Sequence, residues 1–343
     1  MTNAIDIKKK VTLIDTTMRD GSHALRHEYE CSHVEKIASG LDEAGIQYIE
    51  ISHGDGLGGS SFTYGFSKVD EFELIEAAAS AVHNAKIAVL LLPGIGTIAQ
   101  LKKAKECGAT AVRVAAHITE ADVCAQHIAA AKEMGLFTAG FLMMAHMADT
   151  GRTVEEAAKM ESYGADYINI ADSAGYLMPN DVYERVEAVG KVVDIPIGWH
   201  AHNNLALAMA NSIAAIEAGA EYLDGTLRGV GAGAGNTQLE VLAGVLERAG
   251  VETGVNFYKI MDLAQKEVDP LLKRPQVIDN GSLMLGYTGV YSSFLLHVYH
   301  AAEKFELEPR DILVEIGRRG VIGGQEDMIL DVAYHMKNAI KMM

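Results

Sequence analysis

The chain has 343 residues, of which 49% are hydrophobic and 22% are charged, and its formal net charge is −17. This composition predicts a globular protein with a substantial core, and the length is enough for one large α/β domain with an appendage or for two domains. The negative charge argues against binding to nucleic acid or to an anionic membrane surface. An anionic substrate would therefore need a local positive charge, from an arginine or from a metal ion.

Other features of the sequence indicate a soluble, cytoplasmic protein. The cysteines, Cys31, Cys107 and Cys124, show no CxxC spacing, which suggests a reducing compartment and no disulfide framework. Residues 1–10 are polar and basic and no apolar segment follows them, so we expect no secretory signal. The longest apolar stretch, residues 87–92, is far too short to span a bilayer.

Apolar, strand-like runs alternate with amphipathic helical stretches from residue 11 to about residue 250. The predicted strands are 11–15, 48–52, 87–92, 111–115, 138–143, 167–171, 197–200 and 222–226. The helical stretches include 31–44, 121–134, 153–163, 205–218 and 239–249, and several of them end at a glycine that leads into the next strand. Eight β-then-α units over about 240 residues predict a (β/α)8 TIM barrel. A doubly wound open sheet is the alternative, but it usually needs fewer units.

The rhythm changes after about residue 256. Residues 257–268, 290–305, 309–317 and 327–342 are predicted to be helices with no strands between them. We therefore expect a barrel domain over residues 1–255 and a helical C-terminal subdomain over residues 256–343.

A His-x-His pair ends the seventh predicted strand. The side chains of His200 and His202 point to the same face of that strand, because residues two apart in a strand do so. Two neutral imidazoles at a strand end form half of a metal site, and Asp20, which follows the first strand, is the best third ligand. In a closed barrel only the eighth strand separates these two strand ends. The alternative, a pair of hydrogen-bonded core histidines, fits a lone histidine better than a same-face pair.

Here the sequence resembles a known family. The segments 17–21 (Thr-Met-Arg-Asp-Gly) and 200–204 (His-Ala-His-Asn-Asn) resemble the DRE-TIM metallolyases of the HMGL-like superfamily, which cleave or form carbon–carbon bonds next to carbonyls. Glu50 matches the glutamate of this family. A glutamate inside an apolar strand is costly to bury without a partner, and Arg19 is the natural one.

A closer resemblance, over essentially the whole chain, is to the 4-hydroxy-2-oxovalerate aldolases, the class II pyruvate aldolases of aromatic and steroid degradation. It is carried by the segments 19–24, 53–57, 91–96, 140–144, 171–173, 231–236, 289–294 and 323–328. The resemblance implies divalent-metal-dependent retro-aldol cleavage of a 4-hydroxy-2-oxo acid to pyruvate and a short aldehyde.

The resemblance also implies roles for individual residues. Asp20, His200 and His202 would hold the metal, most commonly Mn²⁺, with Asp20 and His200 also bordering the substrate. Arg19 would bind the substrate and stabilise the developing enolate. His23 would act as the general base on the 4-hydroxyl, although by pattern alone it could equally be an exposed loop histidine.

Two more residues are assigned by the resemblance, and both have simpler alternatives. Ser173 would contact the substrate carboxylate, but a serine after a strand is also typical of a helix N-cap or turn. Tyr291 would lie over the substrate near the 4-hydroxyl or aldehyde, but it could be an ordinary aromatic at a helix start. The glycine-rich segment 231–236 looks like a dinucleotide fingerprint, yet no acidic ribose partner follows it, so a close-packed loop is the better interpretation.

The resemblance further implies a partner, an acylating acetaldehyde dehydrogenase that consumes the aldehyde with NAD and CoA, docked on the helical subdomain. A Claisen-condensing acyl transferase of the isopropylmalate or homocitrate synthase type is the alternative enzyme. Such enzymes commonly carry glutamine where this chain has His23, so the histidine favours aldol chemistry. A non-catalytic scaffold whose helical tail binds a partner is the third hypothesis.

Overall fold

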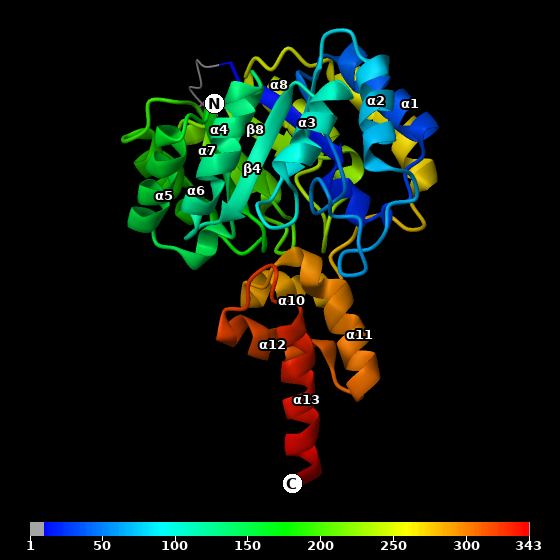
Figure 1. Cartoon of the computed structure of the whole chain (residues 1–343), viewed down its shortest axis with the longest axis vertical. Helices are drawn as coiled ribbons and strands as arrows, with labels where there is room; N and C mark the ends of the chain where they lie inside the picture. Colours follow the sequence, from blue (N-terminus) through cyan, green and yellow to red (C-terminus); the bar gives the residue numbers. More distant parts are fainter. Residues whose placement is uncertain (1–9, 343) are drawn as a thin grey trace.

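The computed structural model describes residues 10–342, and the N-terminal segment on which we judged the secretory signal lies almost wholly outside this range. Within it, eight parallel strands close into a barrel in chain order, which confirms the predicted TIM barrel (Figure 1). The strands are β1 (Thr12–Met18), β2 (Tyr48–Ile51), β3 (Lys86–Leu91), β4 (Ala111–His117), β5 (Phe137–Met143), β6 (Tyr167–Asp172), β7 (Ile197–Ala201) and β8 (Tyr222–Gly225). Because β8 pairs with β1, no edge remains open, and the open-sheet alternative is wrong.

Helices surround the barrel, one after each strand. They are α1 (Cys31–Ala44), α2 (Glu71–Ala81), α3 (Ile98–Glu106), α4 (Ala125–Glu133), α5 (Thr150–Ser162), α6 (Pro179–Gly190), α7 (Ala208–Glu217) and α8 (Leu239–Ala249). Their ends follow local chemistry: the Thr97 side chain accepts from the Gln100 amide to start α3, and Asp149 caps α5 in the same way. Gly108, in the turn after α3, has φ +107°, and a Cβ there would lie 2.4 Å from that of Ala79. This position therefore requires glycine.

The first helix after the barrel packs on the barrel itself. Helix α9 (Phe257–Leu263) and the π-helical turn that continues it (Ala264–Val268) lie against α1 and α8 and contribute Ile260 to the barrel's hydrophobic cluster. The division expected after residue 255 remains a prediction, and this packing favours a boundary some residues later.

The last four helices form a second hydrophobic cluster of their own. They are α10 (Asn280–Thr288), α11 (Leu295–Phe305), α12 (Pro309–Arg319) and α13 (Asp327–Met342). Figure 1 shows α10 next to one end of the barrel, α12 farther from the barrel than α10, and α13 running away from it. Of these helices, α10 was not predicted, and the predicted helix 290–305 is α-helical only from Leu295, after a 3-10 turn. None of the helices among residues 10–342 is long and apolar enough to cross a membrane.

Candidate metal centre and active site

The structure brings the three predicted metal ligands together. Asp20 lies in a 3-10 turn directly after β1, His200 lies in β7, and His202 follows it. Asp20 Oδ2 is 3.2 Å from His200 Nε2 and 3.3 Å from His202 Nε2, and all three side chains are buried. These atoms are therefore close enough for one ion to bind all three residues.

The hydrogen bonds of the two Nδ1 atoms show which nitrogen of each imidazole is left to bind a cation. His200 Nδ1 bonds the Asp224 carboxylate at 2.8 Å, and His202 Nδ1 bonds the Ala232 carbonyl at 3.3 Å. Both partners can only accept, so each Nδ1 carries a proton, and Nε2 is the atom of each ring that is left for a metal ion. Both Nε2 atoms face Asp20 Oδ2. A carboxylate oxygen and two imidazole nitrogens that converge in this way fit a divalent metal ion.

The electrostatics keep Asp20 ionised. Burial alone would raise the pKa of its carboxyl, but His202, Arg19 and the hydrogen bonds to both histidines hold the pKa well below its usual range. Asn236 also donates to Asp20 Oδ2 at 2.8 Å. A carboxylate and two imidazoles with open positions suit Mn²⁺, Mg²⁺, Fe²⁺, Co²⁺ or Zn²⁺.

Arg19 presents an unused donor beside the ligands. Its Nε donates to Glu50 Oε2 at 2.7 Å, as the sequence led us to expect, and its Nη1 is 3.6 Å from Asp20 Oδ2. Burial opposes the charge of this guanidinium, but Glu50 and Asp20 raise its pKa overall. Arg19 Nη2 is buried and has no hydrogen-bond partner among the described residues. A buried donor without a partner is costly, so this atom is poised to bind an oxygen of a substrate.

Two charged residues of this site were missed from the sequence. Arg113, on β4, donates to Glu50 Oε2 at 3.3 Å and also to Asp224, on β8. Asp224 in turn holds His200, so a buried chain of charges links the metal side of the site to Arg19. Burial would raise the pKa of Asp224, but Arg113 and His200 lower it overall. The sequence did contain a signal for both residues, because Arg113 and Asp224 interrupt apolar strands just as Glu50 does.

One cavity collects the predicted site residues. It is lined by Arg19, Asp20, His23, Ser173, His200, His202 and Tyr291, together with Gly54, Asp55, Leu90, Leu92, Phe141, Met143 and Ser293. Only Glu50, which lies behind Arg19, is absent from its wall. The cavity thus lies at the carboxyl ends of the strands, where barrel enzymes carry their active sites.

Ser173 and Tyr291 reach the cavity from different parts of the fold. Ser173 directly follows β6, and its hydroxyl accepts from the Met144 amide at 3.1 Å, which leaves its own proton free to donate to a ligand. Tyr291 comes from the C-terminal helices, at the start of the turn Ser292–Phe294, and burial raises the pKa of its hydroxyl. The glycine-rich segment 231–236 contributes the Ala232 carbonyl and the Asn236 amide to the ligands, as a close-packed loop would.

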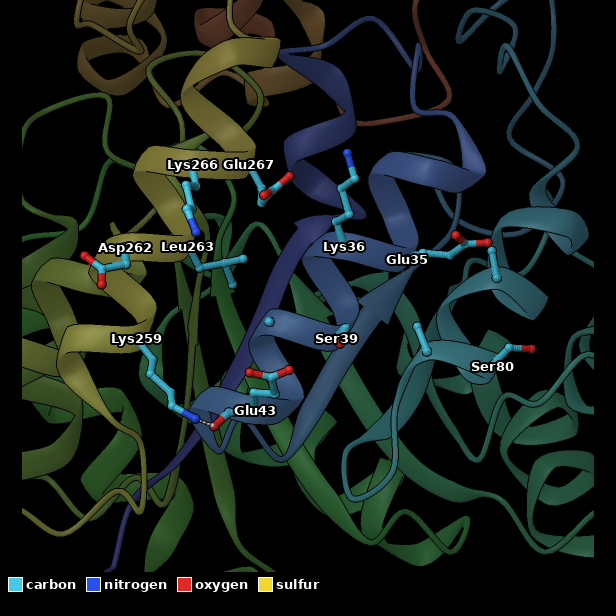
Figure 2. A pocket seen from close by; sticks show the side chains of 13 residues that line it. Glu35, Lys36, Ser39, Glu43, Ser80, Lys259, Asp262, Leu263, Lys266 and Glu267 are labelled. Atoms are coloured by element: carbon cyan, nitrogen blue, oxygen red, sulfur yellow. Dashed lines mark hydrogen bonds between the residues drawn. The ribbon is translucent and has the colours of Figure 1, made fainter.

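Two other hollows differ in their relation to the site. A cavity of about 390 Å³ shares Asp55, Leu92, Met143 and Tyr291 with the site and extends to Gly323. A groove of about 830 Å³ lies on the outer wall between α1, α2 and α9. Figure 2 shows that its labelled side chains carry charges of both signs, and it shares no residue with the site. The outer groove is therefore not the catalytic cavity.

Comparison with known proteins settles the family. Residues 10–266 match the HMGL-like family model, and residues 276–338 match the DmpG-like communication domain. The chain belongs to the HMGL-like family. It is 59% identical to the 4-hydroxy-2-oxovalerate aldolase of Moorella thermoacetica over 96% of this chain and 97% of the relative. It is 57% identical to the protein of that name from Geobacillus stearothermophilus, over 96% of each chain.

Solved structures agree on the fold. The carboxyl transferase domain of Rhizobium etli pyruvate carboxylase (Y628A, with pyruvate) superimposes with a TM-score of 0.82 at 17% identity, covering 98% of this chain and 62% of that one. The N-terminal domain of a putative aldolase from Bacteroides vulgatus gives a TM-score of 0.71 at 23% identity, covering 83% of this chain and 95% of that one. At such identities the likeness concerns the fold alone.

Proposed function

We propose that the protein cleaves 4-hydroxy-2-oxo acids of the 4-hydroxy-2-oxovalerate type to pyruvate and a short aldehyde. The observation that carries the proposal is the shared cavity, which joins a metal-ligand set, an unpaired guanidinium donor and a histidine that can act as a base. The nearly full-length relatives named 4-hydroxy-2-oxovalerate aldolase support it.

Asp20, His200 and His202 would hold the metal ion, for which we propose Mn²⁺. When bound, a divalent ion supplies Lewis-acid stabilisation of negative charge on the 2-oxo and carboxylate oxygens of the substrate.

The chain's own residues account for the remaining requirements of the reaction. His23 takes the proton of the 4-hydroxyl, the electron pair of that O–H bond forms the aldehyde carbonyl, and the C3–C4 bond breaks. Its electrons pass to the enolate of pyruvate, whose oxygen accepts from Arg19 Nη2. Ser173 donates to the substrate carboxylate, and Tyr291 closes the cavity beside the departing aldehyde. A proton from solvent adds to C3 and completes pyruvate, and His23 returns its proton to solvent.

Replacement of the ligands tests the proposal. Asp20→Ala, His200→Ala and His202→Ala should each abolish Mn²⁺-dependent release of pyruvate from 4-hydroxy-2-oxovalerate. Chelated wild-type enzyme should recover activity when Mn²⁺ is added back. Metal analysis decides each ligand: a variant that still binds one equivalent with native affinity removes that residue from the set. Homologous substrates of increasing length would define the aldehyde, and with it the choice between aromatic and steroid catabolism.

A Claisen-condensing acyl transferase remains the alternative, because Arg19, Asp20 and the His200–His202 pair fit both chemistries. His23 favours the aldolase. Incubation with acetyl-CoA and a 2-oxo acid separates them, since release of CoA would reject the aldolase proposal.

We further propose that an acylating acetaldehyde dehydrogenase docks on the C-terminal helices and receives the aldehyde. The match of residues 276–338 to a communication domain supports docking. The cavity of about 390 Å³ supports transfer, because it adjoins the catalytic cavity at Tyr291 and is also lined by Gly323, Gly324 and Glu326 of that subdomain. If the aldehyde passes within the complex, added aldehyde should compete poorly with aldehyde made from labelled substrate. Equal incorporation of free and internal aldehyde would contradict transfer. A cytoplasmic location stays a prediction.

A further inference from the structure

Three imidazoles meet beside the metal ligands, and two of them are held neutral. His27 and His53 stack with ring centroids 3.7 Å apart, and the edge of this pair meets His23, whose ring centroid is 5.2 Å from that of His27. His53 Nδ1 accepts from the Asp55 amide at 3.1 Å, and its Nε2 donates to the Gly65 carbonyl at 3.1 Å. Burial lowers the pKa of His53 to about 4 and that of His27 to about 2.

His23 differs from its two neighbours. Its ring lines the catalytic cavity, with 15% of the side chain exposed, and it makes no hydrogen bond within residues 10–342. Its ion-pair partner is Asp55, whose Oδ2 is 3.9 Å from His23 Nε2. Burial raises the pKa of the Asp55 carboxyl, and His23 is the group that most opposes this rise. Asp55 is therefore the carboxylate that faces the His23 ring, and its Oδ2 also lies 3.6 Å from His53 Nδ1.

Gly54 lies directly against the His23 ring. A Cβ on Gly54 would lie 2.6 Å from His23 Nε2 and 2.7 Å from Cε1, distances that no real Cβ atom adopts. The backbone at Gly54 is not in the left-handed region, so conformation does not require glycine here. The close approach of the His23 ring does.

We propose that Asp55 and Gly54 are positioning residues for His23: Gly54 leaves the space in which the ring lies, and Asp55 orients the ring and stabilises its protonated form. This inference rests on the proposed role of His23 as the base.

Several charged or titratable groups face His23 and contribute to the pH profile of the reaction. They are Arg19 and Asp20 at the end of β1, His27 in the following turn, His53 and Asp55 after β2, and Tyr291 from the C-terminal subdomain. Of these, Asp55 is the carboxylate that pairs with His23, so its removal should change the profile most directly.

Asp55→Asn tests the carboxylate. We expect cleavage of 4-hydroxy-2-oxovalerate to fall on the order of tenfold, and the acidic limb of its pH profile to move down by about one pH unit, because an opposite charge at this distance favours the protonated imidazole. Oxaloacetate decarboxylation, which leaves the same enolate but has no 4-hydroxyl to deprotonate, should stay within about twofold of wild type. Equal losses in both reactions, or an unchanged limb, would overturn the inference.

Gly54→Ala tests the space under the ring, with Gly151→Ala as its control. Gly151 lies in the first turn of α5, and a Cβ there meets nothing closer than 3.4 Å. We expect Gly54→Ala to lose cleavage on the order of tenfold or more while decarboxylation persists, and Gly151→Ala to lose neither. Retained decarboxylation also shows that the variant folds. Native cleavage in Gly54→Ala would overturn the role of Gly54.

His23→Ala separates this inference from the proposed function. If His23→Ala keeps both cleavage and the acidic limb, the base lies elsewhere and the proposed mechanism fails. If His23→Ala loses both, Asp55→Asn should add almost nothing in that background, because residues that act through one another are not additive. Full additivity of the two losses would reject positioning while leaving His23 as the base.

Discussion

One oxygen atom, Asp20 Oδ2, lies at the middle of the proposed metal site. Asp20 Oδ2 lies within 3.3 Å of nitrogens from His200, His202 and Asn236, and 3.6 Å from Arg19 Nη1. The Nε2 atoms of both histidines converge on this oxygen, and the hydrogen bonds of their Nδ1 atoms leave Nε2 as the atom that would bind a cation.

With a divalent ion bound, the buried charges around Asp20 Oδ2 would favour an anionic substrate. The carboxylates of Asp20, Glu50 and Asp224 outnumber the guanidiniums of Arg19 and Arg113 by one. A divalent ion would therefore turn the network from one net negative charge to one net positive charge. This local reversal supplies what a chain with a net charge of −17 otherwise lacks.

Arg19→Lys should lower kcat by about a hundredfold with a smaller change in KM. Lysine keeps the charge but loses the fork that bonds Glu50 through Nε while leaving Nη2 for the enolate oxygen. A donor of this kind is worth roughly 3 kcal/mol in the transition state. Steady-state kinetics with Arg152→Lys, an ion-paired arginine on the outer wall, as control would check this. Near-normal turnover would assign Arg19 a structural role beside Glu50.

Asp224→Asn should weaken Mn²⁺ binding about tenfold or more. The change keeps the volume but lets the amide present a donor to His200 Nδ1, which disturbs the tautomer that leaves Nε2 free for the metal. Titration calorimetry measures the affinity directly, and Asp166→Asn, in an exposed ion pair with Lys132, is the control. Equal affinities for the two variants would show that Asp224 does not orient the ligand.

Local patterns in the sequence marked only some of the proposed site residues. His200 and His202 were found from their spacing at a strand end. Glu50, His23, Ser173 and Tyr291 were assigned by the resemblance to known families, and the cost of burying Glu50 pointed to Arg19 as its partner. Arg113 and Asp224 obey the same argument about cost, but their partners lie on strands far away in sequence. Their pairing depends on the closure of the barrel, which no local pattern contains.

At the scale of elements, the failure to predict α10 has a specific cause. Its sequence contains Gly281 and Gly286, which weaken helix propensity and blur the apolar periodicity. The helix forms because Asp279 and Ser282 build a capping box at its start. Gly286 is needed for packing, since a Cβ there would lie 2.7 Å from Leu205 of the barrel. Tertiary contact thus outweighs local propensity.

Two histidines, His27 in the turn after β1 and His53 in the loop after β2, should lower the free energy of unfolding in acid. His27 and His53 stay neutral in the folded state, with pKa values lowered to about 2 and about 4, whereas both would protonate below about 6.5 when unfolded. Between pH 6.5 and 4 the unfolded state therefore binds more protons, and stability falls as the pH falls. Each histidine contributes a slope of about 1.4 kcal/mol per pH unit.

His27→Asn removes one of these groups, and asparagine tolerates the φ of +59° at this position. Urea unfolding of metal-free protein from pH 7.5 to 5 should show a smaller loss of stability for His27→Asn than for wild type. His300→Asn, at an exposed position on α11, should follow the wild-type slope. Parallel curves for His27→Asn and wild type would show that His27 is not buried neutral.

At the scale of the molecule, residues of the barrel and of the C-terminal subdomain meet at the candidate catalytic cavity. The repeat of strand, helix and glycine predicted the barrel because each unit obeys the same local rules. The way in which the C-terminal subdomain completes the site was not predictable from such rules. It depends on Tyr291 lining the cavity and on His146, whose Nε2 bonds the Gly289 carbonyl across the two units at 2.9 Å.

Ser292 links this subdomain to the proposed substrate site through hydrogen bonds. Its hydroxyl donates to the Ser173 carbonyl at 2.7 Å and accepts from Asn204 at 2.8 Å, and both bonds are buried. Ser292→Ala removes both bonds, while the Ser173 carbonyl keeps the backbone amide of residue 292 and Asn204 keeps the Ala174 carbonyl. The loss should therefore cost only about 0.5–1.5 kcal/mol for each bond. Because Ser173 and Tyr291 flank the break, we expect KM for 4-hydroxy-2-oxovalerate to rise severalfold.

Ser282→Ala is the matched control for this change. It removes a buried serine of the same subdomain, but the hydrogen bonds of that side chain stay with Asp279, at the start of α10. Thermal unfolding should therefore show lower stability for both variants, while steady-state kinetics should show a raised KM for Ser292→Ala alone. If both variants raise KM equally, loss of subdomain stability explains the effect. In that case the hydrogen bonds of Ser292 would not be what positions the residues that bind the substrate.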